Sequence, residues 1–497
     1  MSETFRLDDI TWNDLNLDEV CSRLDTASSS VGSEYLRELL RTCELSEDRL
    51  LKRDELCRFF SEKKHLKKQI GKIFTGLGRI KKVSFRDYIF KLDELENESS
   101  AKHYVLALLM LISIATVFIK PVFGVIMLVA MFIINIATYF SAKAKIENYF
   151  LCIKYLVRMV VCADRLRKLP LSGTVLEEYS DRLSVLSGIF SPVKRGSWLI
   201  TNSVSGSLTD VFMDYIRMLF HVDIIKFNSM KKIVLSNKES VEELYCILGE
   251  LEACICISDF RENSRAWCVP DFSGSCISFE NITHPLITDD AVANSLDLQG
   301  SILITGSNAS GKSTFLKSTA LNQIFAQTIY TCLAGSFHTK FYKVVTSMAL
   351  NDNILNNESY FIVEIKSIKR IFDQLGDIPV ICFIDEVLRG TNTTERIAAS
   401  SVILKHLSGE NAVVFAATHD IELTGLLKNH MENYHFSESV QAGDVHFDFK
   451  IKQGPSDSRN AIKLLEVFGF DRDIVDEARS LAETKTLKTC LGGDRNV

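Results

Sequence analysis

Residues 301–317 read SILITGSNASGKSTFLK, and this stretch decides the class of the C-terminal half of the chain. Residues 306–313 fit the phosphate-loop pattern G-x-x-x-x-G-K-[ST]. The loop follows an apolar run and precedes a helical pattern, so it has the strand–loop–helix context that phosphate binding requires. Glycines let backbone N–H groups close around phosphate oxygens, and the start of the helix adds its positive dipole end. The stretch therefore predicts a nucleotide site.

Two side chains of this loop have predicted chemical roles. We expect Lys312 to reach the β- and γ-phosphates and Ser313 to offer its hydroxyl to Mg²⁺. The cofactors implied are ATP and Mg²⁺. The predicted ATP-binding residues of the segment are Gly306, Ser307, Asn308, Ala309, Ser310, Gly311, Lys312, Ser313 and Thr314.

Two further apolar runs end in polar residues. Residues 380–386, VICFIDE, read as a buried strand that ends in Asp385 and is followed by Glu386. Asp385 is suited to hold Mg²⁺, directly or through water, and Glu386 to polarise the attacking water. Residues 412–420, AVVFAATHD, read as a third strand that leads into His419, which we expect near the γ-phosphate. We predict Glu386, His419 and Lys312 as catalytic residues; the alternative is a strand that happens to end in two acids.

Composition limits what the whole chain can be. Its 497 residues leave room for about two to four domains. The formal net charge of −6 gives no general case for a nucleic-acid binder. The 13 cysteines contain no CxxC pair, which predicts a reduced, cytosolic setting for most of the chain.

The first half of the chain is predicted to be helical. Residues 1–100 and 142–265 have apolar positions at three- and four-residue spacing, which indicates an all-α core and connector. Residues 62–91 carry ten Lys and Arg against two acids. This run is either a solvated helical face or a contact for phosphates of lipid headgroups or DNA. We predict that it faces headgroups beside the apolar segment that follows it.

That apolar segment runs from Tyr104 to Phe140 and is broken only by Lys120-Pro121. Its halves extend for 16 and 19 residues without a charge, and a membrane-spanning helix needs about 20 apolar residues, with a range of roughly 17–25. Neither half has the polar face of a helix in a soluble core. More cations flank the outer ends than the turn, which places both termini in the cytoplasm. We predict a transmembrane hairpin at residues 101–141 that contacts membrane lipid; the alternative is a hairpin buried in a helical domain.

The C-terminal half resembles the ATPase domain of the MutS (DNA mismatch repair) family, itself related to ABC ATPases. TGSNASGKSTFLK is similar to the family's phosphate loop, FIDEVLRGTNTTE to its DE-x-x-RGT segment and FAATHDIELTGL to its ATH-x-x-EL segment. NITHPLI, NNESYFIVEI and GPSDSRNAIKLLEVFGFDRDIVDEA extend the resemblance over about residues 266–483, and residues 5–100 resemble the start of the family's helical core. The resemblance implies an α/β P-loop ATPase domain with a largely parallel sheet and a C-terminal helical dimerisation element at residues 266–497.

The resemblance also implies a dimer with composite sites. In the family a serine at a helix N-terminus reaches the partner's γ-phosphate, and the matching position is Ser359; the alternative is an ordinary helix cap. The aromatic that stacks on adenine aligns with Ala291, so either Phe449 supplies the stack or base selectivity is looser. The family's mismatch-reading domain has no counterpart in this sequence.

Together these features predict a membrane-anchored MutS-like ATPase, with its ATPase domain in the cytoplasm, that hydrolyses ATP as a homodimer. DNA as a partner stays open, because the resemblance favours it while the acidic charge and the hairpin argue against mismatch recognition. The alternatives are a membrane-tethered ABC-like switch or scaffold without a DNA role, and an ordinary mismatch repair protein.

Overall fold

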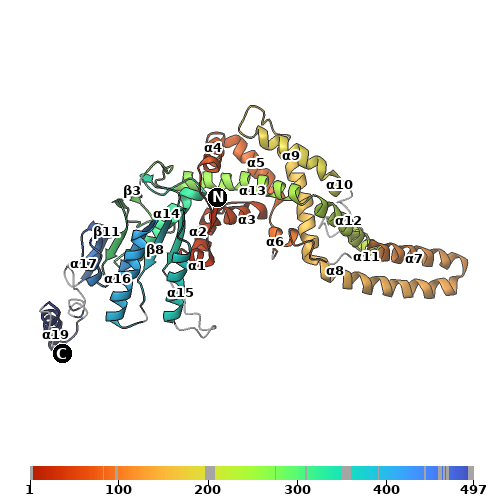
Figure 1. Ribbon diagram of the computed structural model, residues 1–497. Helices are drawn as coiled ribbons and strands as arrows, with labels where there is room; N and C mark the ends of the chain where they lie inside the picture. The colour runs from red at the N-terminus through yellow and green to blue at the C-terminus, as the bar shows by residue number, and fades with distance from the viewer. Residues whose placement is uncertain are drawn as a thin grey trace. The chain divides into compact units, whose positions relative to one another are not determined.

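The computed structural model describes residues 4–81, 83–95, 99–195, 208–274, 276–307, 310–348, 360–389, 391–441, 444–456, 462, 465 and 469–490. The chain forms two compact units. The sheet unit contains residues 1–23, 40–51 and 264–497, and the helical unit contains residues 24–39 and 52–263. In Figure 1 the strands β3 to β11 of the sheet unit are green to blue, and most helices of the helical unit are red to light green.

A six-stranded sheet with strand order β11-β10-β5-β9-β8-β7 forms the centre of the sheet unit. All neighbouring strands are parallel except β10 and β11. The bounds are β5 Ile302–Thr305, β7 Lys343–Ser347, β8 Val380–Asp385, β9 Ala412–Thr418, β10 Glu432–Gln441 and β11 Asp444–Gln453. Every residue of β5 and β8 is buried, which explains their continuous apolar sequences. The predicted α/β domain with a largely parallel sheet is confirmed.

Helices and a smaller sheet accompany the large sheet. The helices are α14 Lys312–Thr328, α15 Tyr360–Asp373, α16 Thr393–Gly409, α17 Glu422–Leu426 and α19 Arg472–Cys490. The smaller sheet has the order β4-β3-β6, with bounds Asn294–Asp297, Ser278–Ile282 and Ser336–His338. Ile368 of α15 and Leu404 of α16 share one apolar cluster with residues of β8 and β9. This cluster holds the helices on the sheet.

The N-terminal residues complete the sheet unit. They form β1 Thr4–Arg6, α1 Asp9–Asp14, α2 Leu17–Leu24 and β2 Thr42–Glu44. The buried Asp14 carboxylate accepts hydrogen bonds from Thr346 Oγ1 (2.7 Å) and Met348 N (2.9 Å) at the end of β7. The sequence pattern groups residues 1–23 with the helical core, whereas in the structure they pack in the sheet unit.

One long helix organises the helical unit. α8, Pro121–Leu166, has 46 residues and is therefore about 69 Å long at 1.5 Å per residue. Its C-terminal part, from Phe150 to Leu166, is largely buried. The other helices of the unit are α3 Ser30–Arg41, α4 Asp48–Glu62, α5 Lys64–Leu77, α6 Phe85–Ile89, α7 Ser100–Ile119, α9 Glu177–Ile189, α10 Ser191–Lys194, α11 Leu208–Leu219, α12 Val222–Ser236 and α13 Lys238–Asn263. The predicted helical N-terminal region is confirmed.

α7 and the first half of α8 form a helical hairpin (Figure 1). They pack tightly at Gly124, where an added Cβ would lie 2.4 Å from the backbone nitrogen of Val117. By length and composition both helices could cross a membrane, since the mean hydropathy of their most apolar windows is 2.0 and 2.3. Only 17% and 22% of those windows is buried inside the structure. Phe118 and Val122, near the turn, are 85% and 79% exposed.

The basic residues 62–91 do not all lie beside this hairpin. Lys67 of α5 pairs with Asp259 of α13 (2.6 Å), and Lys64 lies 3.7 Å from Glu262 of the same helix. The C-terminal end of α5 packs against the buried half of α8, at Arg158. Lys64 and Lys67 therefore have acidic partners on α13, and the predicted contact of the run with headgroups stays a prediction.

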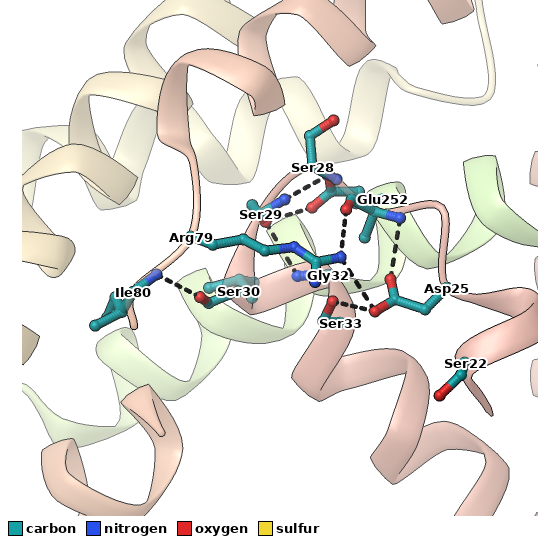
Figure 2. A network of polar contacts seen from close by, with 12 residues as sticks. Ser22, Asp25, Ser28, Ser29, Ser30, Gly32, Ser33, Arg79, Ile80 and Glu252 are labelled. Atoms are coloured by element: carbon teal, nitrogen blue, oxygen red, sulfur yellow. Dashed lines mark hydrogen bonds and ion pairs between the residues drawn. The ribbon is translucent and has the colours of Figure 1, made fainter. Parts of the chain in front are cut away.

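A buried carboxylate joins the start of α3 to α13 (Figure 2). Glu252 Oε1 accepts hydrogen bonds from the N–H groups of Ser28 (2.7 Å) and Ser29 (3.1 Å), and Oε2 accepts one from the Ser29 hydroxyl. Burial raises the pKa of Glu252, and these hydrogen bonds oppose that shift. Beside it, Asp25 accepts hydrogen bonds from Ser33 Oγ (2.5 Å) and Arg79 Nη2 (3.1 Å). The network gives partners to polar groups ahead of α3 that helix bonds leave unpaired.

We predict that Glu252→Ala lowers the free energy of unfolding by about 2–4 kcal/mol, because the N–H groups of Ser28 and Ser29 lose their acceptor. Glu252→Gln keeps an acceptor oxygen for both groups and should cost less than half as much. Urea unfolding followed by circular dichroism measures both, with the exposed Glu242→Ala as a control expected to change stability by less than about 0.5 kcal/mol. Equal losses for the alanine and glutamine variants would contradict this role.

Candidate active site

The phosphate loop connects β5 to α14 and depends on two glycines. Gly306 and Gly311 have φ values of 148° and 108°, a backbone conformation that residues with a Cβ rarely adopt. A Cβ at Gly306 would lie 2.8 Å from the carbonyl oxygen of Phe436, and one at Gly311 would lie 3.2 Å from Cδ1 of Phe449. The loop therefore closes tightly at the N-terminus of α14, where unpaired N–H groups favour an anion.

Lys312 is folded back onto this loop. Its Nζ donates hydrogen bonds to the carbonyl oxygens of Gly306 and Ser307, each at 2.7 Å. Burial lowers the pKa of Lys312, while the nearby carboxylates of Asp385 and Glu386 oppose that shift. A buried amine held by two carbonyls is well placed to form stronger, charge-assisted hydrogen bonds with an incoming phosphate.

Ser313 and Asp385 meet where the metal is predicted. Ser313 Oγ donates a hydrogen bond to Asp385 Oδ2 (2.5 Å). A hydroxyl and a carboxylate are the hard oxygen ligands that Mg²⁺ prefers, so these residues fit the predicted ion. No group of three or more His, Cys, Asp or Glu among the described residues is arranged to hold a metal. The remaining ligands for Mg²⁺ would therefore come from the nucleotide and water, as is common for this ion.

Glu386 lies directly beyond β8 with a left-handed backbone, φ 63°. Its N–H donates to the carbonyl oxygen of Ala417 in β9 (2.9 Å), which holds it in place despite the strain. Its Oε1 lies 3.2 Å from Nδ1 of His419, and its Oε2 lies 2.5 Å from Nε of Arg389. The structure thus brings the predicted Glu386 and His419 together beside Asp385.

Two charged residues of this site have no predicted role in the sequence. Arg389 belongs to the family-like segment FIDEVLRGTNTTE, but residues 386–389 are not helical, so no helical spacing rule indicates its contact with Glu386. Glu438 of β10 contacts the hydroxyl of Ser307. It lies far along the chain from the loop, and only the pairing of β10 with β5 brings it there.

A cavity of about 160 Å³ lies beside the phosphate loop. Its lining includes Gly311, Thr314, His284, Ala291, Asn294 and Phe449. Phe449 therefore lines the same cavity as Ala291, the position at which the family resemblance places the base-stacking aromatic. An aromatic face at one wall of an otherwise largely apolar cavity suits a planar base.

The backbone around Phe449 is fixed from the neighbouring sheet. The Asn294 amide of β4 donates to the carbonyl oxygen of Phe449 (3.0 Å) and accepts from the N–H of Ile451 (2.9 Å). Phe449 itself has a φ of 52°. Across the cavity, burial lowers the pKa of His284 to about 4, so its ring is neutral at pH 7. The cavity thus offers mainly apolar and neutral polar groups to its occupant, together with the carboxyl group of Asp290.

Three predicted residues lie outside the described part of the chain. They are Asn308 and Ala309 of the phosphate loop and Ser359 ahead of α15. Their predicted roles stay predictions. Ser310, by contrast, is buried within the loop.

Residues 302–486 match the family model of MutS domain V. The DNA mismatch repair protein MutS of Natronomonas pharaonis is 29% identical over 272 residues, which cover 52% of this chain and 31% of that protein. MutS of Thermus aquaticus is 27% identical over 249 residues, 49% of this chain and 30% of that protein. MutS of Lactobacillus delbrueckii subsp. bulgaricus is 30% identical over 268 residues, 51% of this chain and 31% of that protein. The chain thus matches about a third of the length of these curated relatives.

MutS domain V is an ATPase domain. The C-terminal part of this chain is therefore a MutS-family ATPase domain, distantly homologous to MutS over about half the chain. ATP binding follows from that domain, and the fold and the phosphate loop agree with it.

We predict that Phe449→Ala raises the Kd for ATP about 5- to 150-fold, because stacking of a base on an aromatic ring contributes about 1–3 kcal/mol. Titration with a fluorescent ATP analogue and competition by unlabelled ATP and GTP measure the effect. Leu426→Ala removes another exposed apolar side chain of the same unit and should leave the Kd unchanged. An unchanged Kd in the Phe449 variant would instead favour the looser base selectivity.

Proposed function

We propose that this chain is a membrane-anchored ATPase of the MutS type that binds and hydrolyses ATP as a homodimer. The observation that carries the proposal is the meeting of four side chains beyond the carboxyl ends of β5, β8 and β9. They are Lys312, Asp385, Glu386 and His419. In sheets of this kind the crevice at that edge is where ligands bind.

Each of these residues has a distinct role in the proposed reaction. Glu386 polarises the attacking water as general base, and His419, 3.2 Å from its Oε1, orients the carboxylate. Lys312 exchanges its two carbonyl partners for phosphate oxygens and stabilises the charge that develops on them. Mg²⁺, held by Ser313 and Asp385, would neutralise the β- and γ-phosphate oxygens.

Arg389 adds a condition to this mechanism. With Oε2 of Glu386 paired to Arg389 and Oε1 facing His419, both carboxylate oxygens are engaged. An oxygen that is held by a neighbouring side chain is not open to an attacking water, and catalytic hydrogen bonds require direct reach of the proton that is abstracted. We therefore expect the Arg389–Glu386 pair to loosen before water is activated.

Membrane anchoring is supported by which side chains the hairpin buries. In α7 the buried residues are His103, Met110 and Ser113, and in the first part of α8 they include Gly124 and Asn135. The exposed side chains are instead Leu, Ile, Val and Phe. A helix pair in a soluble core would have the reverse arrangement, with its apolar side chains covered. Polar groups turned inward and apolar groups turned outward are what a bilayer favours.

The dimensions of the hairpin also suit a bilayer. α7 has 20 residues and is about 30 Å long, which matches a hydrocarbon core of about 30 Å. Lys120 stands at the turn, and Lys102 lies near the opposite end of α7. The long side chains of lysine reach the headgroups from such positions. We place the ATPase domain in the cytoplasm, because the outer ends of the hairpin carry more cations than its turn.

The proposals of a homodimer and of a DNA partner rest only on the match to the family. MutS-family ATPases dimerise, and Ser359 is the residue we expect to reach the partner's γ-phosphate. The relatives are named DNA mismatch repair proteins, but this chain matches only about a third of their length. The alternative is a membrane-tethered switch or scaffold without a DNA role. Salt-dependent titration against duplex, mismatched and branched DNA separates the two.

We predict that Glu386→Gln lowers ATP turnover about 10²- to 10⁴-fold while ATP binding is retained, because the amide cannot accept a proton from water. Phosphate release and nucleotide titration measure the two properties. Glu280→Gln, an exposed acid of the same unit, should change neither. If turnover in the Glu386 variant is unchanged, Glu386 is not the base.

We predict that the wild-type protein stays in the membrane pellet after carbonate washing and that the variant Leu111→Arg/Ile126→Arg is released. Each arginine at the centre of a spanning helix costs about 2.5–3.5 kcal/mol of insertion free energy. Leu51→Arg, at an equally exposed leucine of α4, should remain in the pellet with the wild type. Release of the wild type by carbonate would contradict membrane insertion.

A further inference from the structure

α11 exposes an apolar face that no other described element covers. Val211, Phe212 and Tyr215 are 51%, 65% and 53% exposed. Their spacing of one and four residues places them on one side of the helix. In the last turn of α11, Met218 packs against the apolar cluster that contains Tyr139 of α8. On the side opposite Val211 and Tyr215, the Arg217 side chain is only 13% exposed. The helix is therefore held at its C-terminal end and along the side of Arg217, while Val211, Phe212 and Tyr215 stay exposed.

The position of α11 relative to the hairpin is fixed by buried polar contacts at the hairpin base. α11 is followed by the turn at His221, whose Nδ1 lies 2.7 Å from Nδ1 of His103 at the start of α7. Its Nε2 lies 3.1 Å from the carbonyl oxygen of Asn135 in α8. Two residues later, Asp223 accepts a hydrogen bond from Tyr139 OH (2.7 Å). Figure 1 shows α11 and α12 at this end of the hairpin.

Three helices that meet at the hairpin base carry exposed aromatic residues. Tyr104 follows His103 and is 59% exposed, and Phe140 follows Tyr139 and is 58% exposed. With Phe212 and Tyr215 of α11 they form what we name the aromatic collar. Aromatic residues are enriched where a membrane meets water, since their apolar rings suit the acyl boundary and the polar tip of tyrosine can reach the headgroups.

Charge agrees with this placement. Lys102 and Lys145, both exposed, lie in the chain just beyond Tyr104 and Phe140 on the side away from the hairpin tip. Cations at this level would face anionic headgroups if the collar lay at the acyl boundary. The exposed apolar surface of α11 then continues that of the hairpin, and a single lipid surface covers both.

We propose that α11 lies in the membrane–water interface and that the aromatic collar, Tyr104, Phe140, Phe212 and Tyr215, sets how deeply the hairpin inserts. This inference rests on the membrane anchoring proposed above. The collar stops insertion because the helices beyond it carry charged side chains and pack into the helical unit. From Tyr104 to Lys120 the hairpin extends about 24 Å, so the tip lysine would reach the far headgroups by snorkelling.

The test uses the full-length protein in vesicles of phosphatidylcholine and phosphatidylglycerol with tryptophan reporters. Phe212→Trp reports α11, Phe118→Trp reports the hairpin tip, and Val185→Trp reports an equally exposed position on α9. The lipids are brominated either near the carbonyl end or near the methyl end of the acyl chains. Wild-type protein supplies the background of the native tryptophans.

We expect the added fluorescence of Phe212→Trp to be quenched most by lipids brominated near the carbonyl end, and that of Val185→Trp not to be quenched. If Phe118→Trp is quenched but Phe212→Trp is not, the hairpin inserts and the interfacial placement of α11 is wrong. If neither is quenched, membrane anchoring itself is wrong. A blue shift of Phe212→Trp that depends on protein concentration but not on lipid would show that a second copy covers α11, which also overturns the proposal.

Discussion

The parallel register of β5, β9 and β8 is the constraint on which the candidate active site depends. Thr305 pairs with Thr418, and Asp385 pairs with Ala417, so the three strands end at nearly the same level. The phosphate loop, Glu386 and His419 follow those ends and therefore meet, although they lie far apart in the chain. A slip of one residue in β8 would turn the Asp385 side chain to the other face of the sheet and away from Ser313.

The parts of the fold that rest on local sequence could be predicted. β5, β8 and β9 are short apolar runs. β5 leads into the phosphate loop, and β8 and β9 lead into Glu386 and His419, so their order in the chain is enough to place Asp385, Glu386 and His419 at one edge. The strand–loop–helix pattern likewise fixes Lys312. This placement could be predicted because parallel strands covered on both faces must be apolar throughout, so the ends of the strands can be recognised in the sequence.

The parts of the fold that rest on long-range contacts could not be predicted from the sequence. Asp14 bonds to Thr346 across 332 residues, and no local pattern shows that the first residues of the chain complete the sheet unit. Within the basic run, the sequence does not show that Lys64 and Lys67 pair with Asp259 and Glu262 of α13. Arg389 is a comparable case. Its contact with Glu386 involves a left-handed backbone at Glu386, and a glutamate in the sequence gives no sign of that conformation.

α8 connects the apolar hairpin of the helical unit to its buried core. After Gly124 the helix contains neither glycine nor proline up to Leu166, and sharp kinks need such residues or an inserted group. The apolar first half and the buried segment from Phe150 to Leu166 are therefore parts of one stiff rod. At the hairpin base, hydrogen bonds of His221 and Asp223 tie α7 and α8 to the start of α12. Hydrogen bonds have stricter geometry than apolar packing.

A rearrangement of the helices around the buried half of α8 must then move the hairpin with it, and whatever surrounds the hairpin resists that movement. If the surroundings are a bilayer, tilting the rod changes how much apolar surface meets the hydrocarbon, at a cost that rises with the mismatch. Membrane and helical unit would thus be coupled through a single helix.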